Sequence, residues 1–140
     1  LLEAGMIDRT CRVGFVQSEQ KELLLQGADI FALTSYSESF GLAVLEAISA
    51  GLSVVTTPGV PLAPVVRDYE LGYVTTLEVE AIALALQQSL DDLSNERQTQ
   101  HRRDRARQLI LENYTWDSIA SNLNKVYQAI LNQEPIPVLY

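Results

Sequence analysis

Four short apolar runs alternate with helix-forming stretches in the first part of the chain. The runs have the length of strands and comprise residues 11–16, 29–34, 52–56 and 72–75. Two of the stretches between them end at Gly27 and Gly51, which are suited to stop helices. Continuous apolar runs of this length are typical of parallel strands that helices cover on both faces. The pattern therefore predicts an α/β fold with a Rossmann-like parallel sheet flanked by helices.

Helical patterns fill the second half of the chain. The predicted helices comprise residues 78–90, a strongly charged stretch at 95–111, and a helix that Thr115 caps and that runs through Leu131. Four strands in this order are typical of half or more of a Rossmann-type domain. We therefore expect one domain over residues 1–131 that lacks its first strands, followed by an extended tail over residues 132–140.

The amino-acid composition limits the size of the core and the kinds of ligand that the protein can bind. The chain has 140 residues, of which 47% are hydrophobic and 20% charged, which is enough for one core. A net charge of -8 and scattered basic residues argue against binding to nucleic acid. Acidic residues surround the one concentrated basic group, so we interpret it as a solvated helix face. That group consists of Arg102, Arg103, Arg105 and Arg107.

The sequence also indicates in which cellular compartment the protein is expected. The lone Cys11 cannot form a disulfide within the chain, which fits a reducing compartment. No apolar run approaches the roughly 20 residues needed to span a bilayer. We expect a soluble, cytoplasmic protein without a transmembrane segment. The chain begins at Leu1 in what reads as the end of a helix, and we expect it to be a piece of a longer protein.

A candidate ligand site follows the second apolar run. Ligands of open parallel sheets bind at the carboxyl ends of the strands, which points to the loop at 34–40 and the helix start at Gly41. Helix N-termini offer unpaired amides to anions, and a glycine there would let a diphosphate approach closely. Glu46, one turn into the helix, would lean back toward this site and accept hydrogen bonds from ribose hydroxyls. Glu38 would stand where an attached sugar lies.

The same residues also allow ordinary structural roles. Glu46 can be an exposed helix residue, and Glu38 can complement the helix dipole. Tyr36 and Phe40 can anchor the loop, and we interpret the single histidine, His101, as a bystander on the charged helix. Position and charge alone leave these alternatives open.

A longer motif surrounds the two glutamates. Residues 38–47 read Glu-Ser-Phe-Gly-Leu-Ala-Val-Leu-Glu-Ala, after a strand-like run that ends in Ser35 and before Gly51 and another strand-like run. Residues 65–68, residues 71–74 and the run Tyr-Thr-Trp at 114–116 extend the similarity. Together they closely resemble the group 1 family of retaining glycosyltransferases, from about Val13 to Tyr127.

The resemblance implies a GT-B architecture of two Rossmann-like domains, with a nucleoside-diphosphate sugar bound by the second and the acceptor by the first. It implies that no metal or other cofactor is required. It also implies that Glu38 is the catalytic residue that orients the transferred sugar, and that Glu46 holds the ribose. The remaining donor-binding residues would be Ser39, Phe40, Gly41 and Leu42.

The chain departs from the family pattern in ways that limit these expectations. It lacks the upstream Arg and Lys that neutralise the diphosphate and the N-terminal acceptor domain, and it has Gln17 where the family usually has glycine. We therefore expect weak donor binding, no activity of this chain alone, and an exposed sheet edge that can dimerise. Two alternatives stay open, a non-catalytic nucleotide-sugar-binding or interaction module of the same fold and a nucleotide-sugar epimerase. The choice among UDP, GDP and ADP donors is also open.

Overall fold

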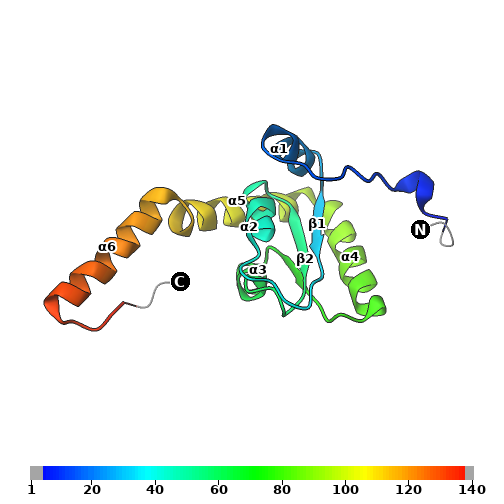
Figure 1. Ribbon diagram of the computed structural model, residues 1–140. Coiled ribbons are helices and arrows are strands. Elements are labelled where there is room, and N and C mark those ends of the chain that lie inside the picture. Colours follow the sequence, from blue (N-terminus) through cyan, green and yellow to red (C-terminus); the bar gives the residue numbers. More distant parts are fainter. Residues whose placement is uncertain (1–4, 138–140) are drawn as a thin grey trace.

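The structure of the protein is a computed structural model that describes residues 5–137 (Figure 1). Residues 1–4 and the last three residues of the expected tail lie outside the described part. The described elements are η1 (Ile7–Arg9), α1 (Glu19–Gln26), β1 (Ile30–Leu33), α2 (Leu42–Ser49), β2 (Ser53–Thr56), α3 (Ala63–Asp68), β3 (Gly72–Val74), α4 (Val79–Leu93), α5 (Glu96–Asn113) and α6 (Trp116–Asn132).

The three described strands form one parallel sheet in the order β1-β2-β3. Ile30 is aligned with Ser53 in the first pair, and Val54 is aligned with Gly72 in the second. All four residues of β2 are buried, whereas β1 and β3 lie at the edges and are partly exposed. The continuous apolar run of β2 thus has the environment expected of a central parallel strand.

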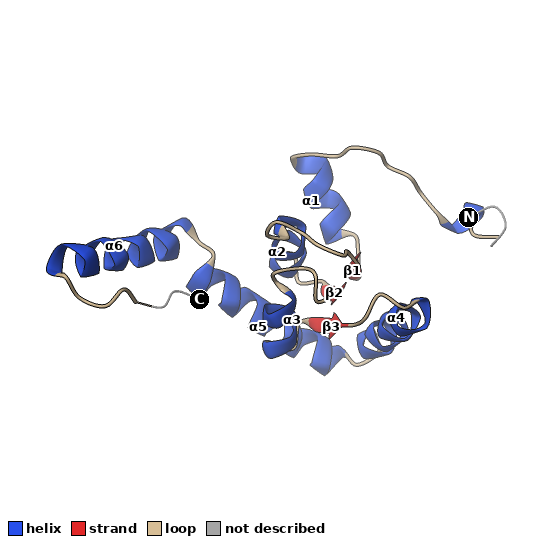
Figure 2. Ribbon diagram, turned by 60° about the horizontal axis from the view of Figure 1, so that its bottom comes forward, coloured by secondary structure: helices blue, strands red, loops and turns tan. Residues whose placement is uncertain are grey.

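Helices cover both faces of the sheet. α2 and α3 connect consecutive strands on one side, and α4 packs on the other side against β2 and β3 (Figures 1 and 2). A buried hydrogen bond of 2.5 Å between the hydroxyl oxygens of Ser53 and Ser89 joins β2 to α4. α5 contacts both α2 and α4, so it ties the two helical layers together.

The core lies between the sheet, α2, α3 and α5. Its buried apolar members are Val44, Ala47, Ile48, Leu52, Val54, Val60, Leu62, Val66, Leu71, Ala106 and Leu109. The core members in α2 and α5 are three or four residues apart, as amphipathic packing requires, whereas Val60, Leu62 and Leu71 come from the loops before α3 and β3. The fold class predicted from the pattern is therefore confirmed.

The strand predicted at residues 11–16 is wrong. This segment is irregular, with Phe15 89% exposed, Val13 51% exposed and Gly14 at a φ of 67°. A strand gains its hydrogen bonds from a neighbouring strand, and none of the described strands pairs with this segment. Three described strands therefore replace the four that the pattern predicted.

The interpretation of the basic cluster is wrong for one of its arginines. Arg103 and Arg107 are exposed and Arg105 is partly exposed, but Arg102 is only 4% exposed. Arg102 lies on the same side of α5 as Ala106 and Leu109, four and seven residues further on, and this is the side that packs on the domain. The helix thus places a guanidinium among its buried positions.

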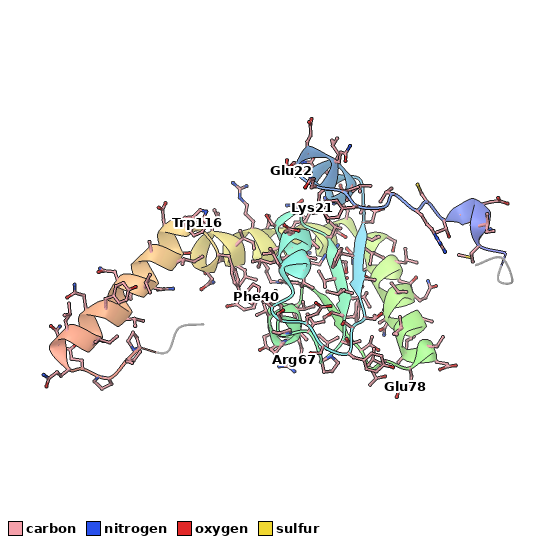
Figure 3. The ribbon with its side chains drawn as sticks, viewed as in Figure 1. Lys21, Glu22, Phe40, Arg67, Glu78 and Trp116 are labelled. Atoms are coloured by element: carbon pink, nitrogen blue, oxygen red, sulfur yellow. The ribbon has the colours of Figure 1, made fainter. Side chains whose placement is uncertain are left out.

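α6 extends away from the sheet at the far end of α5 (Figure 1). It begins with a capping box in which Thr115 and Ser118 exchange hydrogen bonds, as expected for a cap at Thr115. Most of its large apolar residues are exposed, including Trp116 at 87% (Figure 3), whereas Ala129 is buried. No helix within residues 5–137 combines the length and the apolar character that crossing a membrane requires.

Candidate functional site

Two loops meet at the carboxyl ends of β1 and β2. The Thr57 hydroxyl donates a hydrogen bond of 2.5 Å to the Ser35 carbonyl, and the Glu38 amide donates one of 3.1 Å to the Gly59 carbonyl. A Cβ atom on Gly59 would lie 2.1 Å from the Tyr36 carbonyl oxygen, so the second loop can approach the first only with glycine there. These contacts fix the loop that carries Glu38 before α2 begins.

The start of α2 presents free backbone donors. The carbonyl of Gly41 accepts the first helical hydrogen bond, from Val44 at 2.8 Å. The amides of Leu42 and Ala43 donate to no acceptor within residues 5–137. Phe40 and Leu42 are 48% and 59% exposed, and Phe40 lies beside this end of the helix (Figure 3). The helix tip is thus open, with unpaired N–H groups at the positive end of its dipole.

The backbone conformation requires glycine at position 41. Its φ is 87°, in the left-handed region that side chains rarely adopt. A Cβ atom there would lie 3.0 Å from Cγ1 of Val60, on the core side of the loop. The missing side chain therefore serves the backbone turn and the packing of Val60.

Glu46 faces α1. The Lys21 ammonium donates a hydrogen bond of 2.5 Å to Glu46 Oε1, and the two side chains are 40% and 31% exposed. This ion pair borders a cavity of about 460 Å³ between α1, α2 and the end of α5. Tyr114, whose hydroxyl has its pKa raised by burial, closes the cavity from α5. Figure 3 shows Lys21 on the side of α1 next to the sheet domain.

Glu38 and Glu46 lie in different surroundings in the structure. Glu38 lies in the loop at the tip of α2, half-buried, and its carboxylate forms no ion pair within residues 5–137. Glu46 lies one turn into the helix, and the cavity beside it is not lined by Glu38, Phe40 or Leu42. The loop that carries Glu38 thus lies at the carboxyl end of β1, as expected. The cavity beside Glu46 does not extend to the tip of α2.

Lys21 and Glu46 together can offer a ligand both a hydrogen-bond acceptor and hydrogen-bond donors. The second carboxylate oxygen of Glu46, Oε2, makes no hydrogen bond to a described residue and can accept one from a hydroxyl group. The ammonium of Lys21 has further donors for an anionic oxygen. The sequence did not single out Lys21, because its contact with Glu46 depends on how α1 packs against α2, 25 residues further on.

Most of the chain is similar to known proteins. The family model for glycosyl transferases group 1 matches residues 1–109. A glycogen synthase of Mycobacterium tuberculosis is 32% identical over 126 residues, which cover 89% of this chain and 30% of that protein. A D-inositol 3-phosphate glycosyltransferase of Corynebacterium diphtheriae is 36% identical over 127 residues, covering 83% of this chain and 27% of that protein.

A solved structure shares the fold. Sucrose-phosphate synthase from Thermosynechococcus elongatus superposes with a TM-score of 0.74 and 26% identity, over 95% of this chain and 33% of that one. The predicted fold, a partial Rossmann-like domain of the GT-B type, is thereby confirmed. The chain spans about a third of the length of these relatives.

Proposed function

The chain belongs to the group 1 family of glycosyltransferases, and on that premise we propose that it forms the donor-binding part of a retaining glycosyltransferase. The enzyme would transfer a sugar from a nucleoside-diphosphate sugar to a hydroxyl group of an acceptor. The transfer breaks the bond between the anomeric carbon and the diphosphate oxygen and forms one to the acceptor oxygen. The acceptor proton passes to the leaving diphosphate, so no protein base is needed for this step.

The observation that carries the proposal is the open tip of α2 at the carboxyl end of β1. The unpaired amides of Leu42 and Ala43 suit a diphosphate, because helix N-termini bind anions without a basic side chain. The hydrogen bonds from Thr57 and Glu38 hold the loop in front of this tip. Charge that develops on the leaving diphosphate would meet donors that are already in position.

Glu38 is assigned to the transferred sugar. Its amide is tied to Gly59, whereas its carboxylate has no ionic partner among the described residues. A carboxylate in this position can accept hydrogen bonds from sugar hydroxyls and orient the anomeric carbon. Ser39 and Phe40 complete the loop between this carboxylate and the helix.

Glu46 is assigned to the ribose, with Lys21 as its support. Lys21 engages Oε1, which leaves Oε2 to accept a hydroxyl hydrogen. Ribose hydroxyls are gripped by carboxylates in other nucleotide-binding α/β domains. The sugar diphosphate would then extend from Glu46 past the tip of α2 toward Glu38.

Saturation-transfer NMR of this chain with UDP-, GDP- and ADP-sugars tests the proposal. The expected result is transfer to ribose and sugar protons of at least one donor, with the signal lost in Glu46→Ala and kept in Glu80→Ala. Glu80 is an exposed residue of α4 that provides a control for the change in charge. Absence of transfer from all three donors would contradict the proposal.

A further inference from the structure

A second cavity, of about 600 Å³, lies on a different part of the domain. It is an open hollow lined by β3, the end of α3, the end of α4 and the first half of α5. It shares no lining residue with the cavity beside Glu46. Arg67, at the rim contributed by α3, is labelled in Figure 3. The cavity is therefore separate from the proposed donor site.

Positive charge is concentrated in this cavity. Its lining includes four arginines, Arg67, Arg97, Arg102 and Arg105, against two carboxylates, Glu70 and Asp92. The balance of four cations and two anions gives a local charge of +2 in a chain whose net charge is -8. An excess of guanidinium groups around a hollow favours an anionic ligand.

Arg102 is buried without a partner. It is 4% exposed, and its Nε atom makes no hydrogen bond although it is shielded from solvent. Its guanidinium also takes part in no ion pair within residues 5–137. Burial lowers the pKa of Arg102, since removal from water disfavours the charged form. A buried charge without a partner is costly, and an anion bound beside it would compensate that cost.

Asp92, a carboxylate of the same cavity, is already engaged. Asp92 accepts hydrogen bonds from the Tyr73 hydroxyl at 2.7 Å and from Gln98 Nε2 at 3.2 Å. Its charge favours the protonated Arg102, but the structure has no hydrogen bond between the two side chains. The guanidinium of Arg102 thus keeps its donors for another acceptor.

A second arginine is fixed at the same cavity. Arg105 donates from Nε to the Tyr69 carbonyl at 2.8 Å and from Nη2 to the Glu70 carbonyl at 2.9 Å. Arg105 also forms an ion pair with Glu70, with Nη2 and Oε2 3.5 Å apart, so these contacts fix the guanidinium at the cavity wall and balance part of its charge. Asn95 and Gln98 add amide groups that can bind hydroxyl groups of a ligand.

We propose that this cavity binds a small phosphorylated sugar at a site distinct from the donor site. The phosphate, whose oxygens accept hydrogen bonds from several directions, lies against Arg102 and Arg97. The sugar hydroxyls lie toward Asp92, Asn95 and Gln98. The volume of about 600 Å³ falls in the range of small-molecule sites, roughly 300–1,000 Å³.

Calorimetric titration of this chain with a hexose 6-phosphate, the same hexose without phosphate, and inorganic phosphate tests the proposal. We expect the hexose 6-phosphate to bind more tightly than inorganic phosphate, and the free hexose not to bind. Arg102→Met should weaken hexose 6-phosphate binding about tenfold or more, the effect of losing a charge-assisted contact. Arg97→Met should also weaken it, and because Arg97 is exposed this variant does not depend on a core position.

The control is Arg107→Met, an exposed arginine of the same helix that does not line the cavity. It should leave the affinity unchanged. No saturable binding of the hexose 6-phosphate, or equal binding by the wild type and Arg97→Met, would overturn the proposal. If inorganic phosphate bound as tightly as the hexose 6-phosphate, the claim that the cavity recognises the sugar would be overturned. Displacement of the hexose 6-phosphate by a nucleoside diphosphate would overturn the claim of a distinct site, whereas failure of donor binding alone would leave this proposal standing.

Discussion

The Tyr73 hydroxyl on β3 donates a hydrogen bond of 2.7 Å to Oδ2 of Asp92 at the end of α4. This bond links the edge strand β3 to the end of the helix that packs against β2 and β3. Burial, together with the hydrogen bond to Asp92 and the charge of Asp92, raises the pKa of Tyr73 from 10.0 to about 12. The positive charge of the nearby Arg102 lowers the pKa of Tyr73, but burial and Asp92 outweigh this effect.

This shift predicts a loss of stability at high pH. The folded state holds the Tyr73 proton more tightly than the unfolded state, so the contribution is complete below pH 10.0 and is lost as the pH rises to about 12. Denaturant unfolding at a series of pH values should show a steeper decline for the wild type than for Tyr73→Phe over this interval. Parallel curves for the two proteins would contradict the assignment.

The glycine before α2 predicts a destabilised variant. In Gly41→Ala the new Cβ must occupy a φ of 87° and approach Val60 Cγ1 to 3.0 Å. The unfavourable backbone alone should lower the free energy of unfolding by about 1–3 kcal/mol. Gly14→Ala is the control, since its φ is 67° but no atom lies within 4 Å of the added Cβ. Chemical denaturation that finds equal losses for both variants would show that Val60 makes no difference.

The edge of β1 predicts self-association. Among the described strands β1 pairs only with β2, and Ala32 on it is exposed. Unpaired strand edges are templates for pairing with another chain, and a charged residue on the edge opposes this. Light scattering should therefore show an average mass that rises with concentration in the wild type and less so in Ala32→Lys.

The exposed apolar side of α6 offers a second surface for association, which Leu123→Glu would disrupt. Leu123 is 45% exposed, and α6, which carries it, extends away from the sheet (Figure 1). If only Leu123→Glu lowers the average mass, association proceeds through α6 and not through the strand edge. A monomer at every concentration would contradict both routes.

Helices and strands with strong local signals were predictable from the sequence. The apolar run at 52–56 and the glycine stop at Gly51 identify β2 and the end of α2, because a buried strand and a helix end leave marks in consecutive residues. Thr115 identifies the cap of α6 for the same reason. The run at 11–16 has the same composition as a strand, but strand formation depends on a neighbour that local sequence does not reveal.

The parts of the sites that depend on packing between distant segments were not predictable. The spacing of Glu38 and Glu46 could be read from consecutive residues, whereas the contact between Lys21 and Glu46 follows from the docking of α1 on α2. Arg102 could have been placed correctly, since it shares the helical period of Thr99, Ala106 and Leu109, which are all buried. Its charge and its basic neighbours suggested a solvated face instead.

The role of Glu46 in donor binding is tested most directly by a thermodynamic cycle. Calorimetry would compare a nucleoside diphosphate with its 2′,3′-dideoxy analogue, each titrated into the wild type, Glu46→Ala and the control Glu80→Ala. The account predicts that the wild type and Glu80→Ala bind the ribose form about tenfold or more tightly than the dideoxy form, and that Glu46→Ala binds both forms equally weakly. A Glu46→Ala protein that keeps the full preference for the ribose form would contradict it.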